Sequence, residues 1–368
     1  MVCDPAGRGP RPCGRTKSGT QFTARDADLY RRAIRSRMNS VGFENTLKWP
    51  AYEEDRSLPI EALRWLDANN VPFVRGHNLI WPGGFGPQSN LPADIRANSS
   101  PTYVARRVDD HFDEILGALK GRVPEWDVVN EPFDNYDIQG RIAAPGVDRR
   151  QGILPTASIA DWFKNARRAD PDAALFLNDF DVLENALPQK SAFNLALIDF
   201  IRRNGGEVDG MGFQGHFGQS GPDFLRMQTV VNQFSPVVQS LAITEFDVDT
   251  LDETLQADIT DDMMVFAFSQ PKFTGFEIWG FWDGDHWLGN SPVYRADWSL
   301  KPSGRRWLDR INNKWKTPPA LRTTSIDGTA SLDGFRGDYG LTATINGRRC
   351  RYDAVLNARR TTLTLTAC

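Results

Sequence analysis

The central part of this 368-residue chain contains no cysteine, because all four cysteines lie near the ends, at Cys3, Cys13, Cys350 and Cys368. The body therefore cannot build a thiol nucleophile or a cysteine-based zinc cluster. The simplest pairing joins Cys3 to Cys13 and Cys350 to Cys368, with free thiols as the alternative.

The sequence also lacks long apolar runs. No uninterrupted apolar segment reaches the roughly 18 residues of a membrane span, so we expect no membrane-spanning helix. The first residues, from Met1 onward, have no apolar stretch typical of a secretory signal. Either the chain is not exported by that route or its natural N-terminus is missing.

Basic residues are scarce in the middle of the chain. Residues 38–317 contain 27 Lys and Arg against 40 Asp and Glu, whereas the whole chain has a net charge of -4. Binding of nucleic acid depends on Lys and Arg that neutralise phosphates. The acidic body therefore predicts that nucleic acid is not a partner.

Helix and strand patterns alternate along the body. Ser100 and Pro101 begin a predicted helix that ends near Gly121, and the strand pattern of residues 126–130 follows at once. Further candidates for buried strands are residues 71–74, 174–177, 211–214, 241–244 and 276–279. Such alternation favours a parallel sheet with helices outside it.

Polar residues stand at or just after the ends of these apolar runs. They are Glu44 and Asn45, His77, Asn130 and Glu131, Asn178 and Asp179, Gln214 and His216, Glu245, and Trp279. Functional groups at the carboxyl ends of many strands are typical of an α/β barrel. An open sheet would instead gather them at one switch point beside a glycine-rich phosphate loop, which the sequence lacks.

The segment Thr317-Pro318-Pro319 stops any helix, and we predict a domain boundary there. The predicted organisation is an N-terminal segment of undefined structure (1–20), a barrel (21–317) and a small β-sandwich-like module (318–368). Within the module, Asn346-Gly347 predicts a hairpin turn. Short strands are expected near residues 329–332, 339–345 and 361–366. A structural cap and a carbohydrate-binding module are both open as its role.

Two glutamates end buried strand patterns: Glu131 follows residues 126–130, and Glu245 follows residues 241–244. Burial raises the pKa of a carboxyl group unless a neighbour compensates. A single glutamate at a strand end is more often structural, bonded to the backbone or to an arginine. Two that face each other can divide the roles of acid and nucleophile that cleavage of a glycosidic bond needs.

Six segments carry a resemblance to a known family. They are VGFENTLKW (41–49), RGHNLIW (75–81), WDVVNEPF (126–133), GMGFQGH (210–216), ITEFDVD (243–249) and EIWGFWDGDHW (277–287). In this order they resemble the signature segments of glycoside hydrolase family 10, over roughly residues 38–315. The resemblance implies a (β/α)8 TIM barrel and an endo-β-1,4-xylanase that needs no cofactor.

By position, the resemblance implies that Glu131 is the general acid/base and Glu245 the nucleophile of a retaining double displacement through a covalent glycosyl-enzyme. It also implies that Asn130 donates to the sugar 2-hydroxyl and that His216 holds Glu245 ionised. The implied substrate-binding residues are Glu44, Asn45, Lys48, His77, Trp81 and Gln214, with Trp279 and Trp287 as the pair that stacks on sugars.

The sequence departs from the family pattern at several positions. The first barrel strand is expected near residues 12–18, which contain no apolar run, so we predict an irregular or incomplete first strand. Phe213 and Phe246 replace smaller or aliphatic residues beside Gln214 and Glu245. We expect their bulk to narrow or retune the site that binds the sugar.

Several features have a structural alternative. Lys48 is interpreted alternatively as a solvated charge, and the three candidate tryptophans as residues of the barrel rim. We interpret His111 as an ordinary helix residue beside the apolar stripe. The pairs Asp247/Asp249 and Asp283/Asp285 lack the spacing of a calcium loop, so we predict solvated loops and no metal site.

Two rival functions stay open: another β-1,4-glycanase, acting on glucan or mannan, and a catalytically silent carbohydrate-binding protein. The partner implied by the resemblance is a xylan-like polysaccharide. We expect a monomer. We expect it outside the cell or in the periplasm, because the implied substrate is a polymer.

Overall fold

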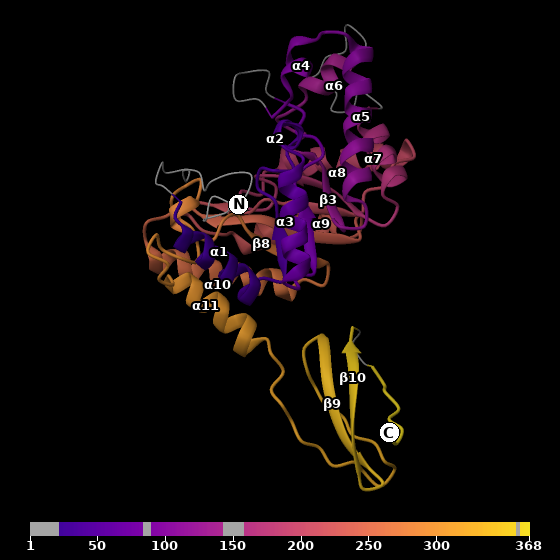
Figure 1. The fold of residues 1–368 in the computed structure, drawn as a ribbon, viewed down its shortest axis with the longest axis vertical. Coiled ribbons are helices and arrows are strands. Elements are labelled where there is room, and N and C mark those ends of the chain that lie inside the picture. The colour runs from indigo at the N-terminus through magenta and orange to yellow at the C-terminus, as the bar shows by residue number, and fades with distance from the viewer. Residues whose placement is uncertain (1–21, 84–89, 143–157, 358–360) are drawn as a thin grey trace. The chain divides into compact units, whose positions relative to one another are not determined.

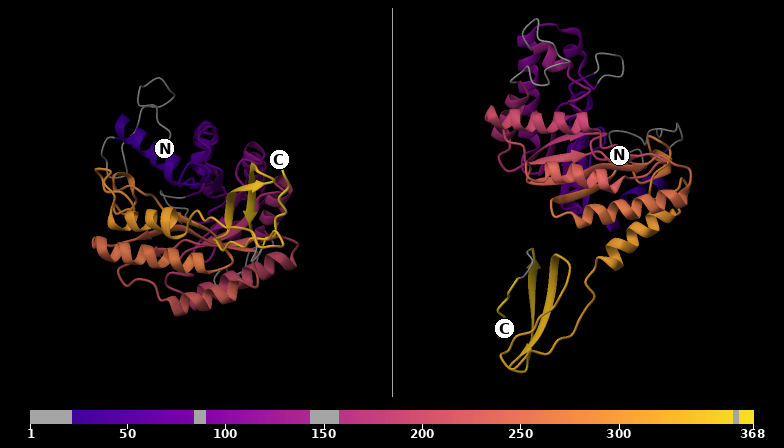
Figure 2. Two further views of the ribbon diagram at one scale, coloured as in Figure 1. Left: turned by 90° about the horizontal axis from the view of Figure 1, so that it is seen from below. Right: turned by 180° about the vertical axis from the view of Figure 1, so that it is seen from behind.

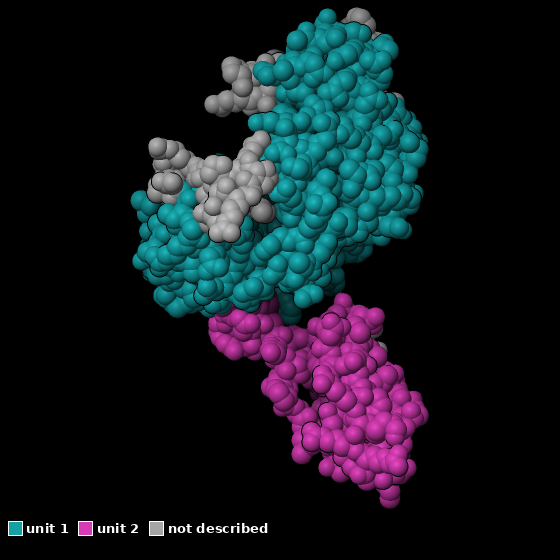
Figure 3. Space-filling model, in the orientation of Figure 1, with its two compact units in different colours: residues 1–305 teal, residues 306–368 magenta. Residues whose placement is uncertain are grey.

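The computed structural model describes residues 22–83, 90–142, 158–357 and 361–368. The chain divides into two compact units, Met1–Arg305 and Arg306–Cys368 (Figure 3). This division falls within helix α11 (Pro302–Asp309), and the π-helical turn η2 (Arg310–Lys314) follows that helix. No helix or strand is present between Lys314 and Gly337, so the predicted boundary at Thr317 lies in an irregular segment.

In the described ranges of the first unit, eight strands form a nearly closed parallel barrel, which confirms the predicted fold class. The hydrogen-bonded order is β1 (Ser40–Gly42), β2 (Phe73–Gly76), β3 (Glu125–Asn130), β4 (Ala174–Asp179), β5 (Gly210–Phe213), β7 (Ser240–Val248) and β6 (His216–Phe217), with β8 (Phe273–Ile278) also paired to β7. At the two ends of this sheet, the side chain of Ser40 in β1 hydrogen-bonds Glu277 in β8. The predicted irregular first strand, near residues 12–18, lies outside the described residues.

Helices lie along the outer side of these strands (Figure 1), as the further views in Figure 2 also show. The helices and turns of this unit that the structure describes before α11 are α1 (Ala24–Arg37), α2 (Trp49–Glu54), α3 (Ser57–Ala68), α4 (Ala93–Ala97), α5 (Pro101–Leu119), α6 (Asp137–Ile142), α7 (Ser158–Ala169), α8 (Pro188–Arg203), α9 (Phe224–Phe234), α10 (Glu253–Ser269) and the short 3-10 turn η1 (Asp283–Asp285); α4 and α6 lie beyond one end of the strands rather than beside them (Figure 1). The predicted helix after Ser100 is confirmed as α5, whose Ser100 hydroxyl accepts a hydrogen bond from the Tyr103 N–H at 3.3 Å. Among the helices within the described ranges, none is long and apolar enough to cross a membrane.

The strand predictions differ from the structure mainly at their ends. Strand β2 begins at Phe73, two residues after the predicted start at Val71, because Pro72 lacks the N–H that a paired strand needs. Strand β7 extends from Ser240 to Val248, beyond the predicted 241–244, because it pairs with β5, β6 and β8 in turn. Its length brings Glu245 and Asp247 onto this strand, whose pairing with β8 shifts register between Ile243 and Phe246.

His111 belongs to the core, which corrects its interpretation as a residue beside the apolar stripe. Its side chain is fully buried, and its ring stacks on Trp49 with 4.4 Å between ring centroids. Its Nε2 lies 2.9 Å from the carbonyl oxygen of Leu79. Burial lowers the pKa of His111 to about 3, so the ring is neutral and packs as an aromatic residue.

The second unit contains one antiparallel hairpin, β9 (Gly337–Ile345) and β10 (Arg348–Leu356). The predicted turn is confirmed: Asn346 and Gly347 have φ of 52° and 80°, the left-handed pair that a type I′ turn requires. Residues 329–332 and 361–366 form no strand, so the described part of the module holds a single sheet rather than the two of a sandwich.

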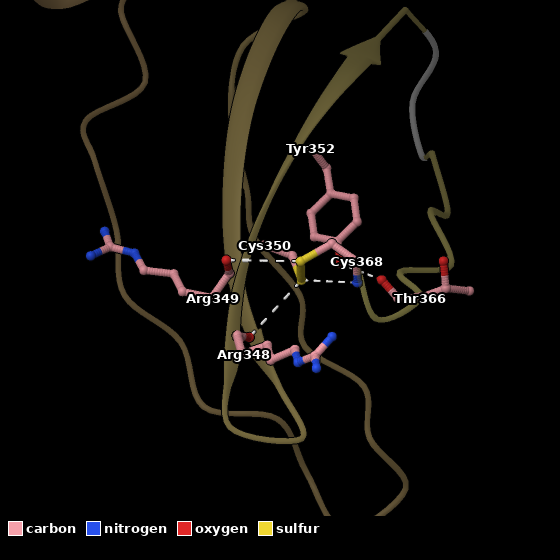
Figure 4. The surroundings of a disulfide bond; sticks show 6 residues. All are labelled: Arg348, Arg349, Cys350, Tyr352, Thr366 and Cys368. Atoms are coloured by element: carbon pink, nitrogen blue, oxygen red, sulfur yellow. Dashed lines mark hydrogen bonds between the residues drawn. A yellow bond between two sulfur atoms is a disulfide. The ribbon is translucent and has the colours of Figure 1, made fainter.

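A disulfide between Cys350 and Cys368 joins the chain end to β10 (Figure 4). It confirms one of the two predicted pairs, while Cys3 and Cys13 lie outside the described residues. The hydroxyl of Tyr352 donates to the carbonyl oxygen of Thr366 at 2.5 Å, a second link between the hairpin and the final segment. The crosslink stabilises a unit whose small sheet buries little apolar surface.

Candidate active site

The candidate residues come together at the carboxyl ends of the barrel strands. His77, Glu131 and Trp279 directly follow β2, β3 and β8, whereas Glu245 lies within β7. Parallel strands of a barrel end on one face, which brings side chains from distant parts of the sequence close together. The backbone N–H of Glu131 donates to Asn178 O, and that of Glu245 to Gln214 O, each at 2.8 Å.

Glu245 is buried and surrounded by groups that favour its ionised form. Asn178 Nδ2 donates to Oε1 at 2.8 Å, His216 Nε2 lies 3.5 Å from Oε2, and His77 Nδ1 lies 3.9 Å from Oε1. Burial acts to raise the pKa of Glu245, but electrostatic attraction to His77 and His216 and the hydrogen bonds of His216 and Asn178 outweigh it and lower the pKa to about 2. The group is therefore a carboxylate at neutral pH.

His216 is held between two carboxylates. Its Nδ1 lies 2.9 Å from Asp247 Oδ1, on the side opposite to Glu245. Burial acts to lower its pKa, but Asp247 and Glu245 together raise the pKa of His216 to about 10. Both ring nitrogens therefore carry protons and can donate. Trp287 Nε1 donates to the other oxygen of Asp247 at 2.6 Å, so a candidate sugar-binding residue shares this network.

Glu131 has different surroundings. Gln214 Nε2 donates to Oε1 at 2.9 Å, and Asn135 Nδ2 approaches Oε2 at 3.2 Å. Burial raises the pKa of Glu131 to about 7, and the negative charge of Glu245 acts in the same direction. One carboxyl group of the site is thus ionised at neutral pH, while the other is close to half protonated.

Asn178 links the predicted residues Asn130 and Glu245. Its Nδ2 donates to Asn130 Oδ1 and to Glu245 Oε1, each at 2.8 Å, and Thr244 Oγ1 donates to its Oδ1 at 2.7 Å. The Nδ2 of Asn130 is buried and has no hydrogen-bond partner in the described part of the chain. A buried donor without a partner costs free energy, so this one is available to a bound hydroxyl.

The other predicted binding residues surround Lys48. Its Nζ donates to Asn45 Oδ1 at 3.1 Å and lies 5.1 Å from the ring centroid of Trp81 and 5.9 Å from that of Trp279. Burial lowers the pKa of Lys48, opposed by its attraction to Glu245 and Glu131. Lys48 is therefore half-buried and lies within electrostatic reach of the two carboxyl groups. Glu44 precedes Asn45 in the same loop.

Three residues that contact the predicted site were not assigned to it from the sequence: Asp127, Asn135 and Asp247. Asn178 was expected at a strand end but was given no role. Asp127 lies within β3, where its Oδ2 is 2.9 Å from His77 Nδ1, and its carboxylate also pairs with the guanidinium of Arg75. The prediction that Asp247 is solvated in a loop is wrong, since it is buried on β7 beside His216. For Asp127 and Asp247, the signal available in the sequence was an acidic residue inside an apolar strand pattern.

Phe213 and Phe246 do not narrow the site. Phe213 packs on Phe234 with 5.5 Å between ring centroids, and Phe246 packs on Phe276 at 4.9 Å. Both are fully buried. Because successive side chains of a strand point to opposite faces, each phenylalanine lies in the apolar wall while its neighbour, Gln214 or Glu245, faces the site.

A parallel barrel that carries one ionised carboxyl group and a second one close to half protonated at the same end has the paired carboxyl groups that cleavage of a glycosidic bond needs. Residues 11–303 match the model of glycosyl hydrolase family 10, and the chain belongs to that family. The match includes residues 12–18, where the first strand was expected.

Relatives of known name agree with this family. The chain is 28% identical to endo-1,4-β-xylanase 3 of Hypocrea jecorina over 297 residues, which are 76% of this chain and 79% of that protein. It is 31% identical to anti-sigma-I factor RsgI6 of Acetivibrio thermocellus over 358 residues, 94% of this chain, but spans only 43% of that protein's length. Xylanase 10B of Thermotoga petrophila, solved in complex with xylobiose, aligns with a TM-score of 0.66 and 25% identity over 78% of this chain and 90% of that one.

Proposed function

We propose that this protein is an endo-acting, retaining β-1,4-xylanase, with Glu245 as nucleophile and Glu131 as general acid/base. The observation that carries the proposal is the opposite pKa shift of the two groups, to about 2 for Glu245 and about 7 for Glu131. A nucleophile must be ionised and an acid must be protonated in the same pH range. These surroundings provide both conditions near pH 6.

In the first step, an oxygen of Glu245 attacks the anomeric carbon while Glu131 gives its proton to the departing glycosidic oxygen. The bond that forms joins the sugar to Glu245, and the bond that breaks releases the rest of the polysaccharide. In the second step, Glu131 takes a proton from water, which attacks the same carbon and frees Glu245. Two inversions at one carbon retain the β configuration.

The surrounding side chains have defined parts in this scheme. His216 and Asn178 donate to Glu245 and aim it. The unpartnered Nδ2 of Asn130 donates to the sugar 2-hydroxyl, a bond that strengthens as positive charge develops on the ring. A retaining mechanism places the carboxyl groups about 5–5.5 Å apart, and we propose that separation for Glu131 and Glu245.

Xylan is the proposed substrate because the Hypocrea jecorina relative is named an endo-1,4-β-xylanase and a similar structure was solved with xylobiose. Trp279 and Trp287 offer flat faces for the apolar side of a pyranose. The Trp287 side chain is 51% exposed, unusual for a tryptophan and suited to a sugar-binding surface. Glu44, Asn45, Lys48, His77, Trp81 and Gln214 are the proposed polar and aromatic contacts to its hydroxyl groups.

We also propose that the protein acts as a monomer outside the cell or in the periplasm. A polymeric substrate does not enter the cytoplasm, and the Cys350–Cys368 disulfide is of the kind that persists in oxidising compartments. The hairpin unit that this disulfide closes is proposed to act as a structural cap or as a carbohydrate-binding module.

The experiment that tests the proposal is proton NMR of the anomer first released from xylohexaose by the wild-type protein and by Glu245→Gln. We expect the β anomer from the wild type and no release from the variant. Release of the α anomer would contradict retention. Equal turnover by both proteins would contradict the role of Glu245 as nucleophile, and no turnover by either would favour the silent carbohydrate-binding protein. Hydrolysis of glucan or mannan, but not xylan, on a polysaccharide panel would replace the proposed substrate.

A further inference from the structure

The turn that follows β3 folds back onto Glu131. Glu131 has a φ of 52°, in the left-handed region, so the chain reverses direction as it leaves the strand. The backbone N–H of Asn135 donates to the carbonyl oxygen of Glu131 at 3.0 Å. The side-chain Nδ2 of Asn135 lies 3.2 Å from this same oxygen and 3.2 Å from Glu131 Oε2. One residue therefore holds both the backbone and the carboxyl group of Glu131.

The loop after β2 fixes the position of Asn135. A Cβ atom added to Gly83 would lie 2.6 Å from the Cβ of Asn135, closer than two such atoms can approach. Only glycine leaves room for the asparagine side chain there. Beside it, the carbonyl oxygen of Pro82 accepts a hydrogen bond from Ile138 N–H at 3.0 Å, which ties this loop to the start of α6. Asn135 is thus held from outside its own turn.

We propose that Asn135 is a positioning residue for the acid/base, and that it fixes the direction of the Glu131 carboxyl group and limits its proton affinity. This inference rests on the proposed function. Gln214 donates to Oε1 and Asn135 to Oε2, so each carboxyl oxygen faces a carboxamide. Donated hydrogen bonds favour the ionised form of a carboxyl group. Together they oppose the effect of burial and keep a group that must both give and take a proton near neutrality.

The variant that tests this proposal is Asn135→Ala, with Asn165→Ala as the matched control. Asn165 also donates through its side chain to a carboxylate, Asp109 Oδ1 at 2.7 Å, but on the exposed surface of α7. Loss of a donor to the ionised form raises a carboxyl pKa. We expect the alkaline limb of kcat/KM to move up by roughly half a unit to one unit in Asn135→Ala and to stay unchanged in Asn165→Ala.

A pair of substrates separates positioning of the acid from general damage. Xylohexaose has a sugar leaving group that needs a proton, whereas 2,4-dinitrophenyl β-xylobioside has one that departs without it. We expect Asn135→Ala to lower kcat/KM roughly 3–10-fold on xylohexaose and less than about 2-fold on the aryl substrate. Equal losses on both substrates with an unmoved alkaline limb would show a merely structural role and overturn the proposal.

A titration that does not depend on turnover distinguishes this inference from the proposed function. The carboxyl carbon of Glu131 is followed by 13C NMR in selectively labelled protein and assigned by its absence in Glu131→Gln. We expect a higher midpoint in Asn135→Ala, and a still higher one in Asn135→Asp, where a second negative charge faces Oε2. Unchanged midpoints in both would overturn the inference. Raised midpoints in a protein that hydrolyses no glycan would overturn the proposed function alone.

Discussion

The two carboxyl groups of the site differ in the elements that carry them and in the charges around them. Glu245 lies within the longest barrel strand and faces His77 and His216. Glu131 lies just beyond its strand and faces the uncharged amides of Gln214 and Asn135. Both lose solvation through burial. His77, His216 and Asn178 outweigh that loss at Glu245, whereas Gln214 and Lys190 do not outweigh it at Glu131. The comparison shows that the opposite pKa shifts, on which the proposed division into nucleophile and acid depends, come from the neighbours of each group.

Removal of each carboxyl group in turn gives the largest expected effect. Glu245→Gly and Glu131→Gly each lack a group that takes part in bond making, and we expect losses on xylan of more than about 10⁴-fold and about 10²–10⁴-fold, respectively. Azide with an aryl xylobioside then distinguishes them. In Glu245→Gly, azide takes the place of the missing carboxylate and gives the α-glycosyl azide. In Glu131→Gly, azide attacks the covalent intermediate and gives the β-glycosyl azide.

The configuration of the azide products, read by NMR, is the measurement. Glu125→Gln is the matched control, because Glu125 is also a buried glutamate but lies at the start of β3 and pairs with Arg75 rather than with the site residues. It should form no glycosyl azide. The same product from both glycine variants would show that the two glutamates do not have separate roles.

The pH dependence of kcat/KM of the wild-type protein should reflect the pKa values of both carboxyl groups. The proposed mechanism needs Glu245 ionised, above its pKa of about 2, and Glu131 protonated, below its pKa of about 7. We therefore expect kcat/KM to be flat between these values and to fall about tenfold per pH unit above pH 7. A profile that rises through pH 7 would reverse the assignment of acid and nucleophile.

The sequence predicted the parts of the site that depend on position along a strand. Glu131, Glu245, Gln214 and Trp279 follow apolar runs, and strand ends meet in a parallel barrel. The resemblance to a family supplied their roles, which the pattern alone left between a structural and a catalytic carboxylate. The helix from Pro101 was predictable because its cap and apolar stripe are local features.

Other contacts were not predictable because they depend on tertiary packing. Asp247 precedes Asp249 in the sequence and both suggested a solvated loop, but pairing of β7 with β6 buries Asp247 against His216. Asn135 carries no signal in the sequence, since its position depends on the backbone reversal at Glu131 and on Gly83. His111 has a polar side chain but packs as an aromatic ring against Trp49.

Asp247→Asn should weaken the positive charge of His216, which acts on Glu245 and helps to distinguish it from Glu131. Without the Asp247 carboxylate, the pKa of His216 falls from its raised value of about 10, and the imidazolium stabilises Glu245 less. We expect the acid limb of kcat/KM to move up by roughly one unit and kcat to fall about tenfold. The matched control is Asp249→Asn, an exposed position two residues further along. If the acid limb of kcat/KM had the same midpoint in both variants and in the wild type, this account of Glu245 would be contradicted.

The smallest expected effect on activity comes from Lys190, a buried cation on the Glu131 side of the site. Its Nζ lies 2.6 Å from Asp134 Oδ2, in the turn after Glu131, and 3.3 Å from Asp179 Oδ1 at the end of β4. Lysine at this place acts to lower the pKa of Glu131, whereas Asp179 acts to raise it. Lys190→Met leaves the buried Asp179 carboxylate without its cation, so we expect a loss of about 3 kcal/mol in the free energy of unfolding.

The double variant Lys190→Met/Asp179→Asn removes both charges and should recover most of that stability, as measured by urea unfolding. In the single variant, the alkaline limb of kcat/KM should rise slightly, because the cation that opposes the raised pKa of Glu131 is gone. In the double variant it should return toward the wild-type value, since the two charges act on Glu131 in opposite directions. If Lys190→Met moved the alkaline limb downward, Lys190 would not act on Glu131 as a favourable charge, and this account of the surroundings of Glu131 would be wrong.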